Sequence, residues 1–282
     1  MNHIKISELF YSIQGEGRYM GVPSVFLRTF GCNFKCAGFG MPRGELSNEA
    51  NNVEPSNYTE YKSLPLVSTG CDSYASWDPR FKHLSPVLSI DSIANAIVDT
   101  LPYKRWENEH LVITGGEPLL GWQRAYPELL EHPKMAALKE LTFETNGTQK
   151  LSDNFYNYLD DQWLGSIRFT SQLTFSVSPK LSGSGELRED AIKPEVIAQY
   201  ESLGYTYLKF VVASEEDAKE ALEVKEMYRD AGFEGPVYLM PVGGVESVYS
   251  WNNRRVAELA MKYGLRYSDR LQVLLFRNEW GT

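Results

Sequence analysis

Residues 31–36, Gly-Cys-Asn-Phe-Lys-Cys, and residues 70–75, Gly-Cys-Asp-Ser-Tyr-Ala, contain all three cysteines of the chain. Three residues separate Cys32 from Cys36, so a tight loop can turn both sulfurs toward one centre. Together with Cys71 they offer three thiolates, which suit a soft metal or an iron–sulfur cluster better than calcium or magnesium. A [4Fe–4S] cluster held by three thiolates would keep one iron open for a ligand from outside the protein.

The cysteines alone leave two other interpretations open. Free cysteine is among the most buried residue types, so all three could be core residues. They could also bind zinc, although structural zinc nearly always takes four ligands at paired spacings. The histidines add no Cys-x2-Cys and His-x3-His pattern; they are His3, His83, His110 and His132.

Composition limits the class of protein. The 282 residues suffice for one large α/β domain or two small ones, and 43% hydrophobic with 23% charged residues is ordinary for a soluble globular protein. A net charge of −9 argues against direct nucleic-acid binding as the main function. Because the first residues lack a signal-peptide pattern and no stretch is long enough to span a bilayer, we expect a cytoplasmic protein without a membrane partner.

Hydrophobic periodicity predicts alternating strands and helices. Strands are expected at 4–13, 25–30, 111–113, 141–143, 173–177, 205–212, 237–240 and 271–276, and helices from 89, near 124–139, and at 194–203, 214–231 and 250–263. This alternation indicates an α/β fold with a parallel sheet and right-handed crossovers.

Polar and glycine-rich motifs follow four of the expected strands. They are Gln14-Gly15-Glu16-Gly17, Thr114-Gly115-Gly116-Glu117-Pro118, Glu144-Thr145-Asn146-Gly147 and Ser178-Pro179-Lys180. Each alone could be a plain turn, and Lys180 could be an ordinary surface lysine. Because sites in parallel sheets collect at the carboxyl ends of strands, their shared position predicts one active site.

These residues resemble the radical S-adenosylmethionine (SAM) enzymes, and among them the 7-carboxy-7-deazaguanine synthase family. The resemblance is carried by Cys32-x3-Cys36, by Cys71-Asp72-Ser73-x-Ala75, by Ser12-Ile13-Gln14-Gly15-Glu16-Gly17 and by Phe26-x-Arg28-x2-Gly31-Cys32-Asn33. In radical SAM enzymes the third cysteine usually falls three residues after the second, where Phe39 stands here. We therefore interpret 37–70 as an insertion in the cluster-binding loop.

The resemblance implies a fold and a set of site residues. It implies one radical SAM domain over 1–282, a partial (β/α)6-type barrel with the long insertion 37–70 in the cluster loop. Cys32, Cys36 and Cys71 would bind the [4Fe–4S] cluster, and Ser73 would bind Mg²⁺. SAM would contact Phe39, Gly70, Asp72, Gly116, Glu117, Glu144, Asn146, Ser178, Pro179 and Lys180. The substrate would contact Ile13, Gln14, Gly15, Glu16, Arg28, Thr114 and the terminal carboxylate of Thr282.

The implied activity is that of a radical SAM carbon–nitrogen lyase of 7-deazapurine (queuosine-type) biosynthesis. The cluster would cleave SAM reductively, and the radical would convert 6-carboxy-5,6,7,8-tetrahydropterin to 7-carboxy-7-deazaguanine by ring contraction with loss of ammonia. The implied partners are the pterin, a flavodoxin or ferredoxin as electron donor, and a second copy in a homodimer. Another radical SAM enzyme, such as an activase, and a zinc-binding or regulatory protein with the same fold are the alternatives.

Two residues depart from the family pattern, and the roles of Arg28 and of the insertion need separate expectations. Gly70 replaces an aromatic residue usual before the third cysteine, and Met240 precedes Pro241 where relatives tend to carry glutamine. Arg28 could pair with a substrate carboxylate or, structurally, with Glu16. Within the insertion we expect 37–46 beside the cluster with Phe39 shielding SAM, 47–57 exposed and mobile, and anchors at Tyr58, Tyr61, Leu64, Leu66 and Val67.

Overall fold

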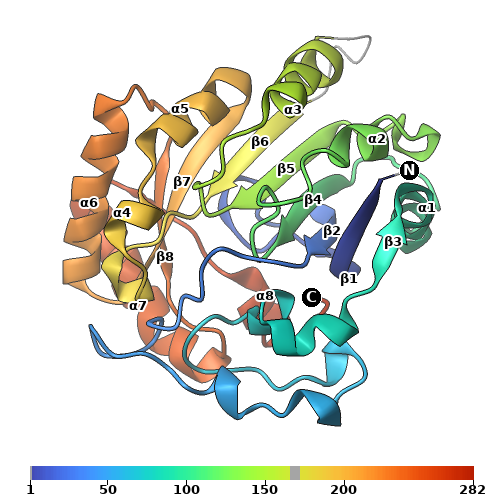
Figure 1. Ribbon diagram of the computed structural model, residues 1–282. Helices are drawn as coiled ribbons and strands as arrows, with labels where there is room; N and C mark the ends of the chain where they lie inside the picture. The colour runs from blue at the N-terminus through green and yellow to red at the C-terminus, as the bar shows by residue number, and fades with distance from the viewer. Residues whose placement is uncertain (1, 166–171) are drawn as a thin grey trace.

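A nine-stranded mixed sheet forms the centre of the computed structural model, which describes residues 2–165 and 172–282 (Figure 1). Its strand order is β3-β1-β2-β4-β5-β6-β7-β8-β9. β1 runs antiparallel to β2 and β3, whereas all neighbours from β2 to β9 are parallel. The strands are β1 (His3–Ile13), β2 (Pro23–Thr29), β3 (Val87–Ser89), β4 (His110–Gly115), β5 (Glu140–Thr145), β6 (Gln172–Val177), β7 (Tyr205–Val212), β8 (Val237–Pro241) and β9 (Arg266–Tyr267).

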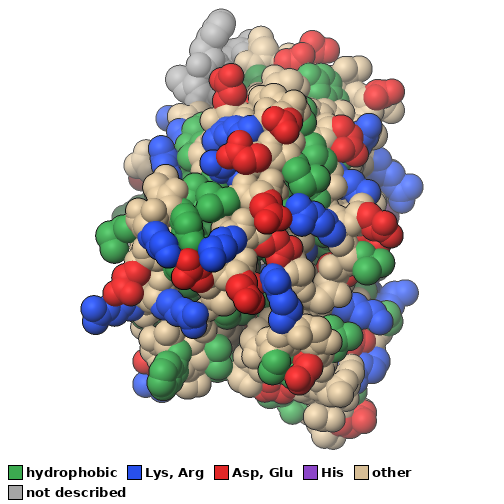
Figure 2. Space-filling view, turned by 90° about the vertical axis from the view of Figure 1, so that its left-hand side faces the viewer, with side chains coloured by type: hydrophobic (Ala, Val, Ile, Leu, Met, Phe, Trp, Pro, Cys, Tyr) green, Lys and Arg blue, Asp and Glu red, His purple; other side chains and the backbone are tan. Residues whose placement is uncertain are grey.

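The helices pack mainly on the outer face of this sheet (Figure 1). They are α1 (Ile90–Thr100), α2 (Tyr126–Leu130), α3 (Asp153–Asn157), α4 (Arg188–Ala191), α5 (Pro194–Leu203), α6 (Glu215–Asp230), α7 (Glu246–Tyr263) and α8 (Leu271–Phe276). Side-chain caps fix two of their starts: Ser89 accepts from the backbone N–H of Ser92, and Ser214 with Asp217 forms the expected capping box. None of the described helices is long and apolar enough to cross a membrane. On the face that carries α6, acidic and basic side chains alternate (Figure 2).

Apolar and polar side chains alternate along the parallel strands, so one face of the sheet is apolar and covered by helices while the other is polar. In β2, β4 and β5 the odd-numbered apolar residues pack in the main core with the helices; they are Val25, Leu27, Leu111, Ile113, Leu141 and Phe143. The intervening even-numbered positions include Arg28, Thr114 and Glu144, which line a cavity. Since successive side chains point to opposite faces of a strand, one pattern builds both the core and the site.

The expected strand at 271–276 is wrong, because the segment forms helix α8. A short apolar run does not distinguish a strand from a helix by periodicity. The sheet edge beside β8 is taken by β9, which the sequence pattern missed together with β3. Only Val273 of α8 is buried, while Leu274 and Leu275 remain exposed. The helix expected near 124–139 is also much shorter, and the one expected from 250 begins at Glu246.

The segment 37–70 contributes to a second, smaller hydrophobic cluster. As expected, Tyr61, Leu64 and Val67 are buried, and they pack with residues that follow the insertion. The expectation that 47–57 is exposed is wrong in part. Val53 is buried, and the Glu49 carboxylate accepts hydrogen bonds from the backbone N–H and hydroxyl groups of both Ser68 and Thr69.

Arg80 also holds the middle of this segment from outside it. Its guanidinium donates to the carbonyl oxygens of Ala50 at 3.0 Å and Asn51 at 3.1 Å, and pairs with Asp78 at 2.6 Å. Backbone carbonyls bonded in this way are fixed relative to the rest of the chain. The insertion is therefore anchored at its centre as well as at its ends.

Candidate active site

One cavity lies at the carboxyl ends of the parallel strands and brings together most of the predicted site residues. The loop after β1, the ends of β2 and β4–β8, the cysteine loop and the C-terminal residues all reach it. From the prediction it includes Ile13, Gln14, Gly15, Glu16, Arg28, Cys32, Cys36, Phe39, Gly70, Cys71, Asp72, Ser73, Thr114, Gly116, Glu144, Asn146, Ser178, Lys180 and Thr282.

The three cysteines converge on this cavity although 34 residues separate the second from the third. Cys36 is buried, and Cys32 and Cys71 are partly buried. Gly116 packs against the first of them: a Cβ there would lie 2.4 Å from the Gly31 carbonyl oxygen and 2.7 Å from the Cys32 Cβ. Only glycine allows the β4 motif to approach the cysteine loop this closely.

Burial keeps the three cysteines protonated unless a cation binds them. It raises the pKa of Cys32 to about 12 and raises the pKa of Cys36 and Cys71 as well. A metal-bound thiol loses its proton, so such buried thiols fit a metal cluster. Among the described residues, no three His, Cys, Asp or Glu side chains are close enough together to hold a single metal ion. The cysteine ligands of a four-iron cluster bind different irons and therefore lie farther apart than the ligands of one ion.

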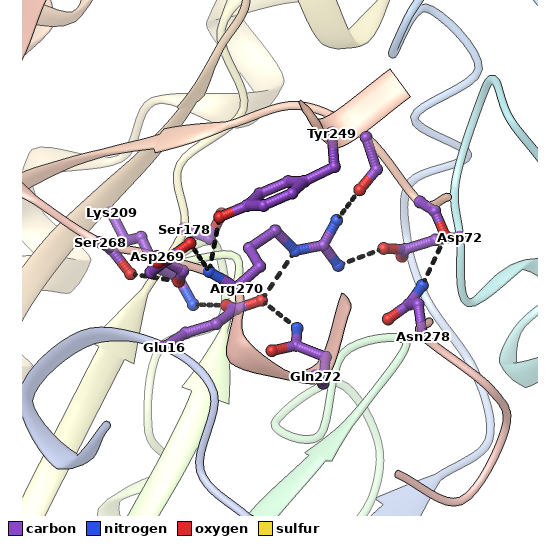
Figure 3. A network of polar contacts seen from close by, with 12 residues as sticks. Glu16, Asp72, Ser178, Lys209, Tyr249, Ser268, Asp269, Arg270, Gln272 and Asn278 are labelled. Atoms are coloured by element: carbon purple, nitrogen blue, oxygen red, sulfur yellow. Dashed lines mark hydrogen bonds and ion pairs between the residues drawn. The ribbon is translucent and has the colours of Figure 1, made fainter. Parts of the chain in front are cut away.

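Glu16 is the centre of a polar network in the same cavity (Figure 3). Its carboxylate pairs with Lys209 and with Arg270 at 3.1 Å, and accepts from Gln272 Nε2 at 2.7 Å. Burial by itself raises the pKa of Glu16, but Lys209 and Arg270 outweigh burial and lower it to about 2. Glu16 is therefore an ionised acceptor at neutral pH.

Arg270 connects this carboxylate to the cysteine segment (Figure 3). Its second terminal nitrogen pairs with Asp72 at 2.6 Å, and the residue before Asp72 is Cys71. The guanidinium also donates to the Gly243 carbonyl oxygen, so every side of the group is bonded. The two carboxylates raise the pKa of Arg270 against the effect of burial.

Gln14 links the Glu16 loop to the end of β5. Its side-chain amide donates to Glu144 at 3.0 Å and accepts from the backbone N–H of Glu16 at 3.0 Å. A Cβ on Gly15 between them would lie 1.8 Å from Gln272 Oε1, so any larger residue there would make the Gln272 side chain move. Gln14 and Glu144 thus present one connected donor–acceptor edge to the cavity.

Arg28 pairs with a residue that the sequence pattern did not single out. Its guanidinium lies 2.9 Å from the Glu8 carboxylate, so the structural ion pair considered with Glu16 is replaced by Arg28–Glu8. Burial raises the pKa of Glu8, and Arg28 opposes that effect. With 20% of its side chain exposed, Arg28 still lines the cavity, and so does Thr282.

Lys180 and Phe39 lie near each other at the surface of the cavity. The Lys180 ammonium donates to Ser178 Oγ at 3.1 Å and lies 5.9 Å from the centre of the Phe39 ring. Ser73 Oγ lies 3.6 Å from Cys71 Sγ, at the cavity surface. A cation, an aromatic ring and a hydroxyl therefore line the same cavity as the cysteines.

Two predicted contact residues do not reach the cavity. Glu117 is fully buried, and its carboxylate accepts from Thr145 Oγ1 and from the backbone N–H groups of Leu119 and Asn146. Glu117 therefore fastens β4 to the end of β5 instead of offering its carboxylate to a ligand. Pro179 is likewise buried and does not line the cavity, although its neighbours Ser178 and Lys180 do.

The sequence pattern missed several residues that shape the site: Glu8, Trp77, Lys209, Arg270, Gln272 and Trp280. Lys209 gives a usable signal, because a lysine interrupts an apolar strand and must be paired where it is buried. The other five residues reach the site through tertiary contacts, which no local sequence motif indicates.

Comparisons with known proteins give a consistent result. No protein-family model matches the chain. A relative from Halobacterium salinarum named 7-carboxy-7-deazaguanine synthase is 33% identical over 98% of this chain and 91% of its own length. One of the same name from Pyrobaculum aerophilum is 27% identical over 99% of this chain and 97% of its own. The crystal structure of QueE from Escherichia coli superposes with a TM-score of 0.54 at 21% identity, covering 95% of this chain and 93% of that one, which shows a shared fold.

Proposed function

The chain belongs to the 7-carboxy-7-deazaguanine synthase family, and from this premise we propose how its cavity works. The enzyme converts 6-carboxy-5,6,7,8-tetrahydropterin to 7-carboxy-7-deazaguanine with loss of ammonia, a step of 7-deazapurine biosynthesis. The observation that carries the mechanism is the convergence of Cys32, Cys36 and Cys71 with the Glu16 network on one cavity. The same relatives favour this reaction over an activase and over a zinc-binding or regulatory protein.

Cys32, Cys36 and Cys71 hold a [4Fe–4S] cluster in this proposal. Three desolvated thiols beside one cavity support it, because thiolates require a cation at a buried site. When bound, the cluster and SAM together supply the radical that takes a hydrogen atom from the substrate. The parallel strands with helices outside support a single partial (β/α)6-type barrel, with 37–70 as an insertion between its cluster ligands.

SAM is held by the strand ends next to the cysteines. Gly116 leaves its backbone open to a ligand, while Asn146 and Ser178 offer polar groups at the ends of β5 and β6. Lys180 supplies a cation for the SAM carboxylate, with Phe39 as an apolar wall beside it. Gly70, Asp72 and Glu144 complete this side of the cavity.

The pterin binds against the Glu16 network. An ionised Glu16 and the Gln14–Glu144 pair can accept N–H groups from the pterin ring edge. Arg28 is available for the substrate carboxylate, with Ile13, Gly15, Thr114 and Thr282 around it. Ser73 contributes its hydroxyl oxygen to a Mg²⁺ ion, which usually retains several waters and binds substrate oxygens.

The remaining partners follow from the chemistry of the proposal. A reduced flavodoxin or ferredoxin supplies the electron, and reduced thiol ligands require a reducing compartment such as the cytoplasm. We also propose a homodimer, as the family resemblance implies. We propose no direct contact with nucleic acid, because the net charge is −9. Sedimentation of the full chain measures the oligomeric state.

The function is tested by anaerobic reconstitution with iron and sulfide, followed by a product assay. Parent protein with SAM, reductant, Mg²⁺ and 6-carboxytetrahydropterin should release 7-carboxy-7-deazaguanine and ammonia in equal amounts. The Cys71→Ser variant should release neither. Cleavage of SAM without any deazaguanine would reject this substrate, and equal product from Cys71→Ser would reject the role of the cysteine.

A further inference from the structure

Glu186 binds the backbone of the Cys32–Cys36 loop from a distant part of the chain. Its carboxylate oxygen accepts the backbone N–H of Lys35 at 2.8 Å and of Cys36 at 2.6 Å. Glu186 follows the short 3-10 turn Ser182–Ser184 and precedes α4, 150 residues after Cys36. No motif of the sequence analysis included this residue.

The same turn holds the chain immediately after Cys36. The backbone N–H of Gly38 donates to the Ser184 carbonyl oxygen at 2.8 Å, and a Cβ on Gly38 would lie 2.7 Å from the Gly185 nitrogen. Cys36 itself has a φ of 50°, a left-handed conformation that non-glycine residues rarely adopt. Such a conformation persists only where the surrounding contacts enforce it. Glu186 and Ser184 are those contacts.

The carboxylate has a second consequence for any cluster bound beside it. The reduction potential of an iron–sulfur cluster depends on local charge and on hydrogen bonds to its sulfurs. Two amides of the ligand loop donate to Glu186 and are not free to donate to sulfur. The negative charge of Glu186 further disfavours adding an electron nearby.

We propose that Glu186 is a positioning residue that holds Cys36 in its ligand conformation and lowers the reduction potential of the bound cluster. The second half of this proposal rests on the proposed function, because it needs the cluster. A strongly reducing cluster is what reductive cleavage of SAM requires. The first half concerns the protein alone and can be measured without iron.

Hydrogen exchange on the full chain before iron is added tests the positioning role. Glu186→Ala removes the acceptor and should speed exchange of the amides in a peptide spanning 31–39 at least tenfold. Glu186→Gln keeps an acceptor oxygen and should exchange more slowly than Glu186→Ala. Glu189→Gln, an exposed change on α4, is the matched control and should match the parent. Unchanged exchange in Glu186→Ala overturns the positioning role.

Redox titration of the reconstituted protein, followed by electron paramagnetic resonance, tests the effect on potential. Glu186→Gln removes one negative charge and should raise the ratio of reduced to oxidised cluster at a fixed potential about tenfold. This change corresponds to a rise of about 59 mV in the reduction potential for one electron. Glu189→Gln should leave the ratio unchanged. An unshifted potential in Glu186→Gln overturns this half of the proposal. A parent that assembles no cluster would instead overturn the proposed function, and hydrogen exchange would still decide the positioning role.

Discussion

Replacing Arg270 by methionine removes the cation that joins Glu16 to the segment after Cys71. The guanidinium is only 10% exposed and lies 3.1 Å from Glu16 and 2.6 Å from Asp72. Removing one partner of a buried ion pair costs about 3–5 kcal/mol of unfolding free energy. Two facts favour the lower end: the Asp72 side chain is 34% exposed, and Glu16 keeps Lys209 and Gln272. We therefore expect Arg270→Met to lose about 3 kcal/mol.

The pH dependence of this loss follows from the lowered pKa of Glu16. Its pKa is about 2 in the folded protein, against an ordinary value of about 4.3 in an unfolded chain. The stabilisation is therefore complete above the unfolded value and is lost as pH falls toward 2. Without Arg270 the pKa of Glu16 in the folded protein rises, so acid removes less unfolding free energy from the variant than from the parent. The difference between parent and variant should narrow between about pH 5 and pH 2.5.

Urea unfolding followed by circular dichroism measures both effects. Arg254→Met is the matched control, because Arg254 is 89% exposed and pairs with Glu258 at 2.9 Å within α7. An exposed pair of this kind contributes at most about 0.5 kcal/mol. If Arg270→Met lost no more unfolding free energy than Arg254→Met, the network would not stabilise the site.

Three further substitutions test two residues that line the cavity, Ser73 and Phe39, and one buried residue outside it, Glu117. Ser73→Ala should lower turnover and leave the cluster spectrum unchanged, with extra magnesium restoring little; a parental rate and magnesium dependence would contradict the Mg²⁺ role. Phe39→Ala should weaken SAM binding several-fold through loss of ring contact with Lys180 and SAM, measured by equilibrium dialysis, and an unchanged affinity would argue against that wall. Glu117→Gln should cost about 1–3 kcal/mol of unfolding free energy, since a carboxylate bonded to Thr145 and Asn146 is replaced by a weaker acceptor. In contrast, a loss of SAM affinity with unchanged stability would restore Glu117 as a direct ligand.

Much of the fold follows from local sequence patterns. In strands β1, β2 and β4–β8 apolar side chains recur at the spacing expected for a sheet that packs helices on one face. The capping box of Ser214 and Asp217 marks the start of α6. The strand-end motifs could be placed together because parallel strands bring their carboxyl ends to one edge. The strand predicted at 271–276 is wrong, since this segment is a helix and β9 occupies the sheet edge beside β8.

The site was less completely predictable, for physical reasons. Cysteines and glycine motifs carry their chemistry locally, whereas Arg270 and Glu16 meet across 254 residues. A glutamate beside a strand end gives no indication of whether its side chain lines the cavity, as that of Glu16 does, or joins two strands, as that of Glu117 does. Glu49 and Arg80 likewise anchor the insertion through contacts with no sequence signature.

We propose that Cys71, from beyond the insertion, completes one cluster with Cys32 and Cys36 beside the cavity. Iron and sulfide analysis after anaerobic reconstitution tests this ligand set, with Cys71→Ser compared against the parent. We predict about four iron and four sulfide per parent chain, as a [4Fe–4S] cluster requires, and a large loss of both in the variant. Equal iron and sulfide in Cys71→Ser, or zinc in place of iron in the parent, would contradict the claim.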